Sequence, residues 1–482
     1  MKNNIVFAIA VVMAVLGSSC KKQLEEVPKN FLTPDQFFQS DQDAIQGVNG
    51  AYTCLIRQGP IYMYQQFLWQ FLDEACDALR LPNSPAVTLS VAPWSYANNF
   101  WSGYYKGIYT TSQIIDKVPR SGSSVLKDRS VGEARFLRAL FYYYATCTFG
   151  DVPLVTERNY SDLATASSLA RTSADSVRAF MIDDLLKAIA VLPDTYSSGS
   201  DKGRATKGAA QTLLVKTYLW RKDWAKAEQV AQDIEASHTY KLLPEYADVF
   251  KENNEFNQES IFEINFEPNL LPSFQADYYE PNNTVGVAPF STNVWFRIYV
   301  PFQSLANSFE PGDKRKDVEI ATGYNGQAFT PDVTNRVSLW FGPKWWRLSA
   351  TRKNSGLDIY HFRYADVLLM LAEAANELGH TSIAEDAINE VRERAGLPDL
   401  SGLSKDDFRT ALQKERGVEL CGEGHLRFDL VRWGIWYEAT KAAALPEEPV
   451  LANSLQPYMD LLPIPQAEIS LNPHLTQNPG WQ

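Results

Sequence analysis

The sequence predicts a mainly α-helical protein in which repeated helical pairs flank an irregular, loop-rich region with few short strands. Three observations support this fold class. Apolar residues recur at three- and four-residue spacing along most of the chain, as on the buried face of a helix. Two separate helical pairs share one internal pattern, which is typical of a repeat architecture. Between these pairs, residues 239–360 are rich in Pro, Asn, Gly and aromatic side chains.

The start of the chain has the pattern of an export signal. Lys2 precedes an apolar run at 5–16, and small residues then lead to Cys20. The run is too short for a membrane-spanning helix, which needs roughly 20 apolar residues. Small residues that end on a cysteine resemble a bacterial lipoprotein signal. We therefore predict that residues 1–19 are a lipoprotein signal peptide and that Cys20 is lipidated; the alternative is an ordinary cleaved signal with a coincidental cysteine.

A polar, proline-containing segment follows the predicted lipidation site. Residues 20–35 have the composition of a tether between a lipid anchor and a folded domain. Thr33 and Pro34 then indicate a helix start, because Pro is favoured in the first turn. Buried acyl chains contribute about 0.8 kcal/mol per methylene group, so several of them would hold the protein on a membrane. No later segment of the sequence is apolar enough to span one.

The composition is that of an acidic globular protein. The chain has 45 Lys and Arg residues against 57 Asp and Glu residues, which gives a formal net charge of -12 at pH 7. Removal of residues 1–19 takes away one lysine and leaves about -13. An acidic chain without a Lys/Arg cluster argues against nucleic-acid binding, which depends on neutralising phosphates. The 12 Trp and 23 Tyr residues direct attention to aromatic side chains outside the helices.

The four cysteines after Cys20 show no spacing that suggests zinc. They are Cys54, Cys76, Cys147 and Cys421. In an exported protein Cys54 and Cys76 could form a disulfide, but both lie in apolar helical patterns, where a buried thiol is equally compatible. The sequence leaves these two alternatives open.

Helical periodicity is clear in the first half of the chain. Residues 133–148 show it, and the sequence Gly-Asp-Val-Pro at 150–153 ends that helix. A second helix is expected over 174–192. The Ser-, Gly- and Asp-rich stretch 194–204 is predicted to be a loop.

Two helical pairs have the same internal pattern. When the pairs are aligned, Ala227 falls on Ala384, and such small residues let antiparallel helices approach closely. The spacing resembles that of tetratricopeptide repeats. Two units are too few for a stable stack, so we expect more divergent ones among residues 35–57 and 100–192. The helices of the two pairs are predicted at 209–220 with 224–236 and at 364–378 with 382–394.

The region 239–360 differs from its surroundings. One clear strand is expected at 260–266, and the segment 343–346 also resembles a strand. Long loops connect these elements, and loops of this length inside a compact domain are usually functional. We therefore expect a ligand site here and in the Pro- and aromatic-containing segment 79–100.

Motifs along the whole mature chain resemble the SusD/RagB family, in the order in which that family has them. His425 is a small departure, because the family often runs directly from Gly to Arg at this point. The motifs are RYADVLLMLAEA at 363–374, NEVRERAG at 389–396, EGHLRFDL at 423–430, LPIP at 462–465 and QNPG at 477–480, together with EARFLRA at 133–139, FGDVPL at 149–154 and KGAA at 207–210.

The resemblance implies an architecture of about four tetratricopeptide-like units in one compact whole. It implies an N-terminal helical region at 36–240 that includes a binding loop, a loop-rich ligand-binding subdomain at 241–360, and a C-terminal helical region at 361–482. It also implies an outward-facing lipoprotein of the outer membrane in Bacteroidetes-type bacteria. Such proteins capture oligosaccharides or peptides without catalysis, use no cofactor, and form a lid on a SusC-like TonB-dependent transporter.

Enzymatic readings have little support in the sequence. Motifs for nucleotide binding, esterase chemistry and a zinc helix are absent. A glycosidase would need two facing carboxylates about 5 to 10 Å apart, and the sequence singles out no such pair. Charged residues on the motif helices are expected to form partly buried ion pairs rather than a catalytic or metal cluster. These residues are Arg363, Asp366, Glu373, Arg427, Asp429 and Arg432.

A glycan site needs flat aromatic side chains beside polar groups that hydrogen-bond to hydroxyls. The segment 79–100 offers this mixture, and the family's sites lie in the corresponding loop and at the acidic helix end before it. Loops around 278–295 and at 340 offer further rings, whereas Trp345 and Trp346 fit less well. A glycan is therefore the favoured ligand; a peptide is the alternative, and a lipid-anchored glycosidase is a distant one. The candidate ligand-binding residues are Asp73, Arg80, Trp94, Tyr96, Asn98, Tyr278, Trp295 and Trp340.

Overall fold

The structure is a computed structural model that describes most of the chain after residue 33. The predicted signal peptide, Cys20 and most of the predicted tether lie outside the described residues. Within the described part, no helix combines the length and the apolar character needed to cross a bilayer. The described ranges are 34–58, 61–64, 68–74, 76, 79–80, 93–290, 299–333, 336–351 and 353–481.

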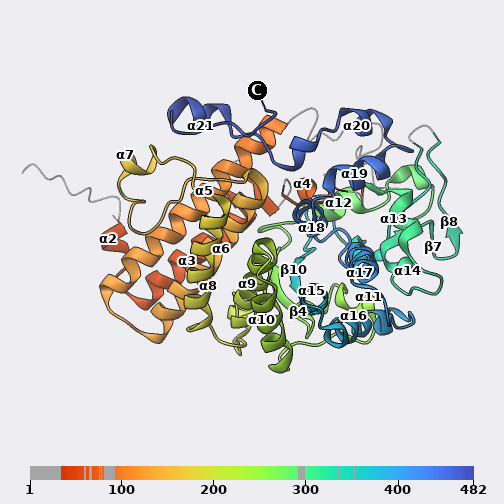
Figure 1. The fold of residues 1–482 in the computed structure, drawn as a ribbon, viewed down its shortest axis with the longest axis horizontal. Coiled ribbons are helices and arrows are strands. Elements are labelled where there is room, and N and C mark those ends of the chain that lie inside the picture. Colours follow the sequence, from red (N-terminus) through yellow and green to blue (C-terminus); the bar gives the residue numbers. More distant parts are fainter. Residues whose placement is uncertain are drawn as a thin grey trace, which may run out of the picture.

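Eight helices pack in a row as four successive pairs (Figure 1). Each helix packs against the one before it, and α10 packs against α15 although the irregular region separates them in sequence. The predicted repeat architecture is therefore confirmed, including the divergent units in the first half of the chain. The pairs are α3 (Asp41–Ile56) with α5 (Pro93–Lys117), α6 (Val125–Phe149) with α8 (Ala174–Ile189), α9 (Lys207–Arg221) with α10 (Trp224–Ala236), and α15 (Tyr364–Leu378) with α16 (Thr381–Ala395).

Small buried residues allow the pairs to pack closely. Ala227 on α10 and Ala384 on α16 are both buried, as their aligned positions predict. The turns between the helices also match. Gly379 ends α15 with a φ of 79°, and Lys222 ends α9 in the same left-handed region with a φ of 57°. Because a side chain disfavours this region, a lysine there is strained where the second pair has glycine.

Polar side chains mark where the helices begin. Ser40 accepts a hydrogen bond from the backbone N–H of Asp43 at the start of α3, and the Asp43 carboxylate accepts from the backbone N–H of Ser40 in return. Ser124 accepts from the backbone N–H of Lys127, so α6 begins eight residues before the predicted start. The periodicity of 133–148 gave only the apolar centre of this helix.

The segment 79–100 is only partly the loop that the sequence predicts. Helix α5 begins at Pro93, which is compatible with a first helical turn because its missing N–H would be unpaired there anyway. Ala97, Phe100 and Tyr104 then recur at helical spacing and are fully buried. Residues 93–100 are therefore helical rather than loop.

The irregular region contains short two-stranded sheets. Strand β4 (Ser260–Ile264) pairs with β10 (Ile359–Arg363), which leads directly into α15, so the strand expected at 260–266 is confirmed. The predicted strand at 343–346 is wrong, because Pro343–Trp345 form a 3-10 helix. The other pairs are β1 (Arg57–Gln58) with β2 (Ile61–Tyr62), β3 (Leu79–Arg80) with β5 (Val300–Pro301), β6 (Ile320–Ala321) with β9 (Trp340–Phe341), and β7 (Gly323–Tyr324) with β8 (Gln327–Ala328).

Shorter helices connect and cover these elements. Helix α17 packs on α15 beyond the last pair. The remaining helices are α2 (Pro34–Phe37), α4 (Leu68–Glu74), η4 (Val118–Ser121), α7 (Leu163–Ala166), η5 (Gly199–Asp201), α11 (Tyr246–Val249), α12 (Gln275–Tyr279), η6 (Asn283–Val285), α13 (Gln303–Ser308), α14 (Lys316–Glu319), η8 (Pro343–Trp345), α17 (Lys405–Glu419), α18 (Leu426–Trp433), α19 (Trp436–Ala444), α20 (Pro449–Ser454), η9 (Pro457–Asp460) and α21 (Gln466–Leu471).

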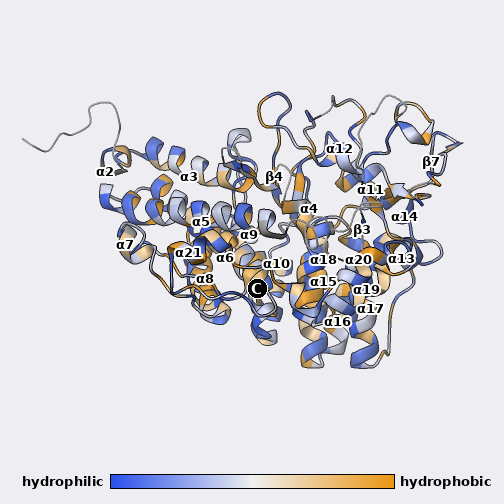
Figure 2. Cartoon of the chain, turned by 90° about the horizontal axis from the view of Figure 1, so that it is seen from above, coloured by the Kyte–Doolittle hydropathy of each residue, from blue (hydrophilic) through white to orange (hydrophobic). Residues whose placement is uncertain are grey.

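One cluster of buried apolar side chains extends from Phe38 to Trp481 and includes residues of the helical stack and of the irregular region. The helices of the stack carry hydrophobic and hydrophilic residues side by side (Figure 2), as amphipathic helices do. Cys54 and Cys76, for which the sequence leaves a disulfide or buried thiols open, both belong to this core. The thiol of Cys54 donates to the carbonyl of Gly50, and that of Cys76 donates to the carbonyl of Asp73.

Candidate functional site

Most of the predicted ligand-binding residues that the structure describes are buried. Tyr96, which the sequence analysis placed in a loop, lies on α5 and is 9% exposed. Asn98 is exposed on the same helix. The Trp94 side chain and the whole of Trp295 lie outside the described residues. Five of the eight candidates are less than a tenth exposed, namely Asp73, Arg80, Tyr96, Tyr278 and Trp340.

Asp73 joins three parts of the chain. Its carboxylate accepts hydrogen bonds from the Tyr279 hydroxyl at 2.8 Å and from the backbone N–H of Gly424 at 2.9 Å. Burial raises the pKa of Asp73 to about 7. Asp73 therefore has a structural role in this conformation, and its contact with a ligand stays a prediction.

Arg80 lies where three predicted binding segments meet. Its guanidinium forms ion pairs with Glu447 at 3.1 Å and Glu448 at 2.7 Å, and it donates to the carbonyl of Arg336 at 2.6 Å. Arg80 is also the register partner of Val300 in the β3–β5 pair. Three segments therefore come together at Arg80. They are the segment that follows Arg80, the segment that precedes Val300, and the segment that contains Trp340.

Tyr278 and Trp340 pack into the core, contrary to the open aromatic platform that the sequence suggested. The Tyr278 ring lies 6.0 Å from that of Tyr299. Trp340 is 1% exposed on β9, opposite Ala321, and meets Phe329 edge to face at 5.3 Å. The reason for the difference is that aromatic side chains in irregular segments also fill the space between short sheets, which composition alone does not reveal.

A hollow of about 410 Å³ lies beside the β7–β8 hairpin. The hairpin turns at Asn325 and Gly326, whose φ values of 48° and 77° are those of a two-residue turn with left-handed central residues. Tyr324, half-buried on β7, meets Trp346 edge to face with 5.7 Å between the ring centroids. We call this space the hairpin hollow; its lining includes Asp317, Tyr324, Asn325, Gln327, Pro343 and Trp346.

The hairpin hollow combines two kinds of surface. The rings of Tyr324 and Trp346 provide apolar contact, and Trp346 is held in place because its indole N–H donates to the carbonyl of Phe341 at 3.0 Å. Exposed Asp317, Asn325 and Gln327 provide hydrogen-bonding groups. None of the described residues that line the hollow is basic. This arrangement suits a neutral, hydroxyl-rich ligand with an apolar face.

Tyr324 is not among the residues that the sequence pattern predicts for the site. The signal was present, because Asn-Gly flanked by short strand-like segments is a strong hairpin pattern. Trp346 was judged less suitable because 343–346 was expected to be a strand. The short helix η8 instead turns the Trp346 ring toward the hairpin, where both Tyr324 and Phe290 contact it.

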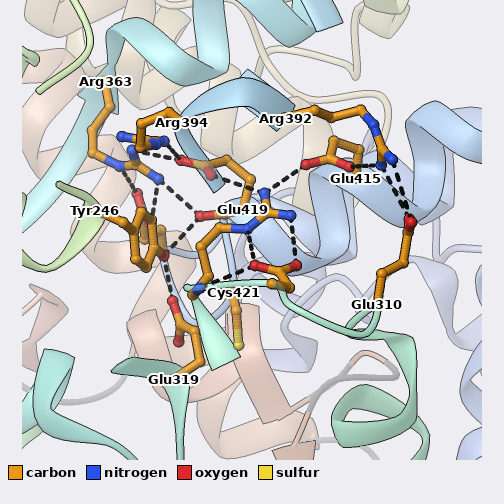
Figure 3. A network of polar contacts seen from close by, with 12 residues as sticks. Tyr246, Glu310, Glu319, Arg363, Arg392, Arg394, Glu415, Glu419 and Cys421 are labelled. Carbon is orange, nitrogen blue, oxygen red and sulfur yellow. Dashed lines mark hydrogen bonds and ion pairs between the residues drawn. The ribbon is translucent and has the colours of Figure 1, made fainter. Parts of the chain in front are cut away.

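Buried ion pairs are formed, as predicted, by five of the charged residues on the motif helices, namely Arg363, Asp366, Glu373, Asp429 and Arg432. Arg363 contacts Glu259 at 2.5 Å, Glu419 at 3.0 Å and Glu423 at 2.7 Å, and Arg394 shares Glu259 and Glu419 (Figure 3). Burial alone would raise the pKa of Glu419, but Arg394, Arg363 and Arg315 lower it to about 2. Each of these groups is paired with at least one opposite charge, so the cluster is a structural network.

A second buried network joins α9 of the third helical pair to α15 of the fourth. Asp366 on α15 accepts from Lys216 on α9 at 2.6 Å and pairs with Arg416 on α17 at 2.9 Å. Asp429 then links Arg416 to Arg432, which pairs with Glu373. Arg427 donates to the backbone carbonyls of Met459 and Asp460. Among the described residues, no three His, Cys, Asp or Glu side chains are arranged to hold a metal ion.

Four stacked helical pairs, joined to a subdomain of short sheets that carries an aromatic hollow, define a helical-repeat protein with a separate irregular subdomain. A family model described as "SusD family" matches residues 334–481, and one described as "Starch-binding associating with outer membrane" matches residues 82–219. Together these matches cover more than half of the chain. The chain belongs to the SusD-like family.

Individual relatives match over almost the whole length. SusD-like protein P25 of Formosa agariphila is 29% identical, with 95% of this chain and 95% of that protein covered. The crystal structure of a SusD homolog from Bacteroides thetaiotaomicron is 25% identical with a TM-score of 0.81, and covers 93% of this chain and 98% of that chain. A solved laminarin binding SusD-like protein is 25% identical with a TM-score of 0.75, and covers 92% of this chain and 100% of that chain.

Proposed function

We propose that this protein binds an oligosaccharide at the bacterial surface without catalysis and delivers it to a SusC-like TonB-dependent transporter. The observation that carries the proposal is the similarity, over 92% of the chain, to a SusD-like protein that binds laminarin. The family model described as starch-binding and associating with the outer membrane supports the same ligand class and location. In this proposal Cys20 carries the lipid anchor and the tether to about residue 35 keeps the domain beside its transporter.

The hairpin hollow supports binding of a sugar. A sugar ring has an apolar C–H face and hydroxyl groups around its edge, and the hollow has rings beside amide and carboxylate groups. The absence of basic residues from its described lining favours a neutral glycan over a sulfated or uronic one. The meeting point around Arg80 is the second part of the proposed site, because the segment that leads to Trp94 begins after Arg80 and the segment with Trp295 ends before Val300, the partner of Arg80.

A non-catalytic role fits the carboxylates of the hairpin hollow. Hydrolysis of a glycosidic bond needs an acid and a facing base or nucleophile. Asp317 is the only carboxylate among the described residues that line the hollow. The buried acids of the two networks are all paired with Arg or Lys, so they are not available as proton donors. A peptide remains the second candidate ligand through the family resemblance alone.

Affinity gel electrophoresis with a panel of neutral and anionic polysaccharides tests the proposal. We expect retarded migration in at least one neutral polysaccharide and no release of reducing ends on long incubation. Release in proportion to protein concentration would instead establish a glycosidase. A peptide array run in parallel decides between the two ligand classes, and binding only on that array would overturn the glycan assignment.

A further inference from the structure

Two hollows lie on either side of the loop that precedes α9. Their volumes are about 290 and 280 Å³, close to the lower end of ligand pockets, which is about 300 Å³. Both are lined by Lys202, Gly203 and Arg204 of this loop and by Phe262 and Glu263 of β4. We call them the loop hollows. They share no lining residue with the hairpin hollow, and β7 and β8 lie at the right-hand edge of Figure 1, whereas α9 lies near the middle of the molecule.

Glu263 is the most unusual side chain of the loop hollows. It is 2% exposed, and its Oε1 accepts a hydrogen bond from the backbone N–H of Phe256 at 2.9 Å. Its Oε2 is buried and accepts no hydrogen bond from the described residues, while the nearby Ser260 side chain, which also lines the first hollow, partly offsets the effect of burial on the pKa of this carboxyl. A buried polar atom without a hydrogen-bond partner lowers the stability of the folded state. Since the residue lines both hollows, a ligand with a hydrogen-bond donor would satisfy this oxygen.

Aromatic rings surround the first of the loop hollows. Tyr196, Tyr240 and Phe256 line it. The Tyr196 hydroxyl donates to the carbonyl of Ala205 at 3.0 Å, and the Tyr240 hydroxyl is 3.0 Å from the Thr206 hydroxyl. Both rings are therefore fixed in place before any ligand arrives, which lowers the entropy lost on binding.

We propose that the loop hollows form a second, independent carbohydrate site, in which Glu263 binds a sugar hydroxyl and the rings of Tyr196 and Phe256 contact the apolar face of one sugar unit. Burial raises the pKa of Glu263 to about 8, so its carboxyl is mostly neutral at pH 7. A neutral carboxyl both donates and accepts a hydrogen bond, as a sugar hydroxyl does. The ligand class rests on the proposed function, whereas the place is new. Two sites on one chain would raise the avidity for a long glycan.

Substitutions at Glu263 test the site on the full chain. The probes are D-glucose, D-galactose, D-mannose and D-xylose, measured by saturation-transfer NMR and calorimetry. Glu263→Gln keeps one donor and one acceptor, and we expect its affinity to stay within about threefold of the unmodified protein. Glu263→Leu keeps the volume and removes both, and we expect affinity to fall at least about tenfold. Glu393→Leu is the matched control, because it makes the same change at an exposed position on α16 that lines neither of the loop hollows.

Two further measurements make the outcome decisive. If Glu263→Leu does not fold, the amide NMR signals of Lys202, Gly203 and Arg204 are followed in the unmodified protein instead. Shifts of these signals on addition of sugar support the site, and unchanged signals overturn the proposal. Tyr324→Ala removes the hairpin hollow. Sugar binding that survives in Tyr324→Ala and is lost in Glu263→Leu places the sugar in the loop hollows and not in the hairpin hollow, which supports the proposed site. If Glu263→Leu binds every probe like the unmodified protein, or if no probe binds while a polysaccharide still does, the second site is wrong and the proposed function stands.

Discussion

Arg363 and Glu419 are in contact at the centre of the molecule, with Nη1 of the guanidinium 3.0 Å from Oε1 of the carboxylate and both side chains fully buried. The same arginine donates to the backbone carbonyl of Glu419 at 2.9 Å. Strand β10 ends at Arg363 and helix α17 ends at Glu419, so this pair ties the irregular region to the last helices of the stack. The pair gives Arg363, the first residue of the motif at 363–374, a structural role.

Glu419→Gln is expected to destabilise the protein strongly. The change leaves Arg363, Arg394 and Arg315 without part of their compensating charge in a buried setting, and breaking such pairs costs about 3 to 5 kcal/mol. Urea unfolding followed by circular dichroism measures the loss. The control is Lys187→Ala, which breaks an exposed pair with Asp183 and should cost at most about 1 kcal/mol. Equal effects of both changes would contradict a central role for the network.

The sequence predicted the stack of helices well because its signal is local and repeated. Helices α10 and α15 match their predicted bounds, since apolar periodicity, small buried residues and clear turns all agree there. The ion pairs were also predictable, because charged residues on otherwise apolar helix faces have to find partners. Both features follow from short stretches of sequence.

The candidate ligand site was predicted less completely, because its residues meet through contacts distant in sequence. Trp340 has the same local context as a binding residue, yet it is buried once β6 pairs with β9. Tyr324 and Trp346 become neighbours only after the hairpin and η8 have folded toward each other. Composition located the subdomain, whereas the rings that line its hollow depend on the packing of short sheets.

Tyr324→Ala is expected to weaken glycan binding at least about tenfold without lowering the stability of the helical stack, because it removes an aromatic contact surface from the hairpin hollow. Calorimetry with the polysaccharide found by gel retardation measures the affinity. Tyr324→Phe is the matched control, since it keeps the ring and removes only the hydroxyl. If Tyr324→Ala binds like the unmodified protein, the hairpin hollow is not the glycan site.

Trp94→Ala tests the other half of the proposed site. Trp94 is the second residue of α5, at the end of the segment that starts from Arg80. We expect binding to be lost or greatly weakened while the thermal unfolding midpoint changes little. Trp224→Ala, at the start of α10 in the helical stack, is the control for removing a tryptophan elsewhere. Unchanged affinity in Trp94→Ala would remove this residue from the site.

Lys222→Gly is expected to stabilise the protein. Lys222 has a φ of 57° at the end of α9, where the equivalent turn after α15 uses Gly379. Glycine relieves the strain of a side chain in the left-handed region, but it also gives the unfolded chain more conformational entropy. We expect the first effect to be larger, so that the free energy of unfolding rises by about 0.5 to 1 kcal/mol. Thermal unfolding measures the shift. Gly379→Ala is the reciprocal change and should lower stability, and a destabilised Lys222→Gly would show that the lysine side chain contributes contacts that outweigh the strain.

Asp73→Asn tests the buried carboxyl between Tyr279 and Gly424. The pKa of Asp73 rises from an ordinary value of 3.8 to about 7 in the folded protein because of burial. Between these pH values the folded state binds more protons than the unfolded state, so the free energy of unfolding falls as pH rises from about 4 to 7 and levels off above pH 7.

The Asp73→Asn variant has no carboxyl at this position that could bind a proton. Relative to Asp73→Asn, the unmodified protein should lose about 1.4 kcal/mol per pH unit between pH 4.5 and 6.5. Urea unfolding of both proteins at several pH values measures the difference, which also cancels the contributions of the other buried acids such as Glu263 and Asp358. Parallel curves would show that Asp73 is ionised in the folded state throughout this range.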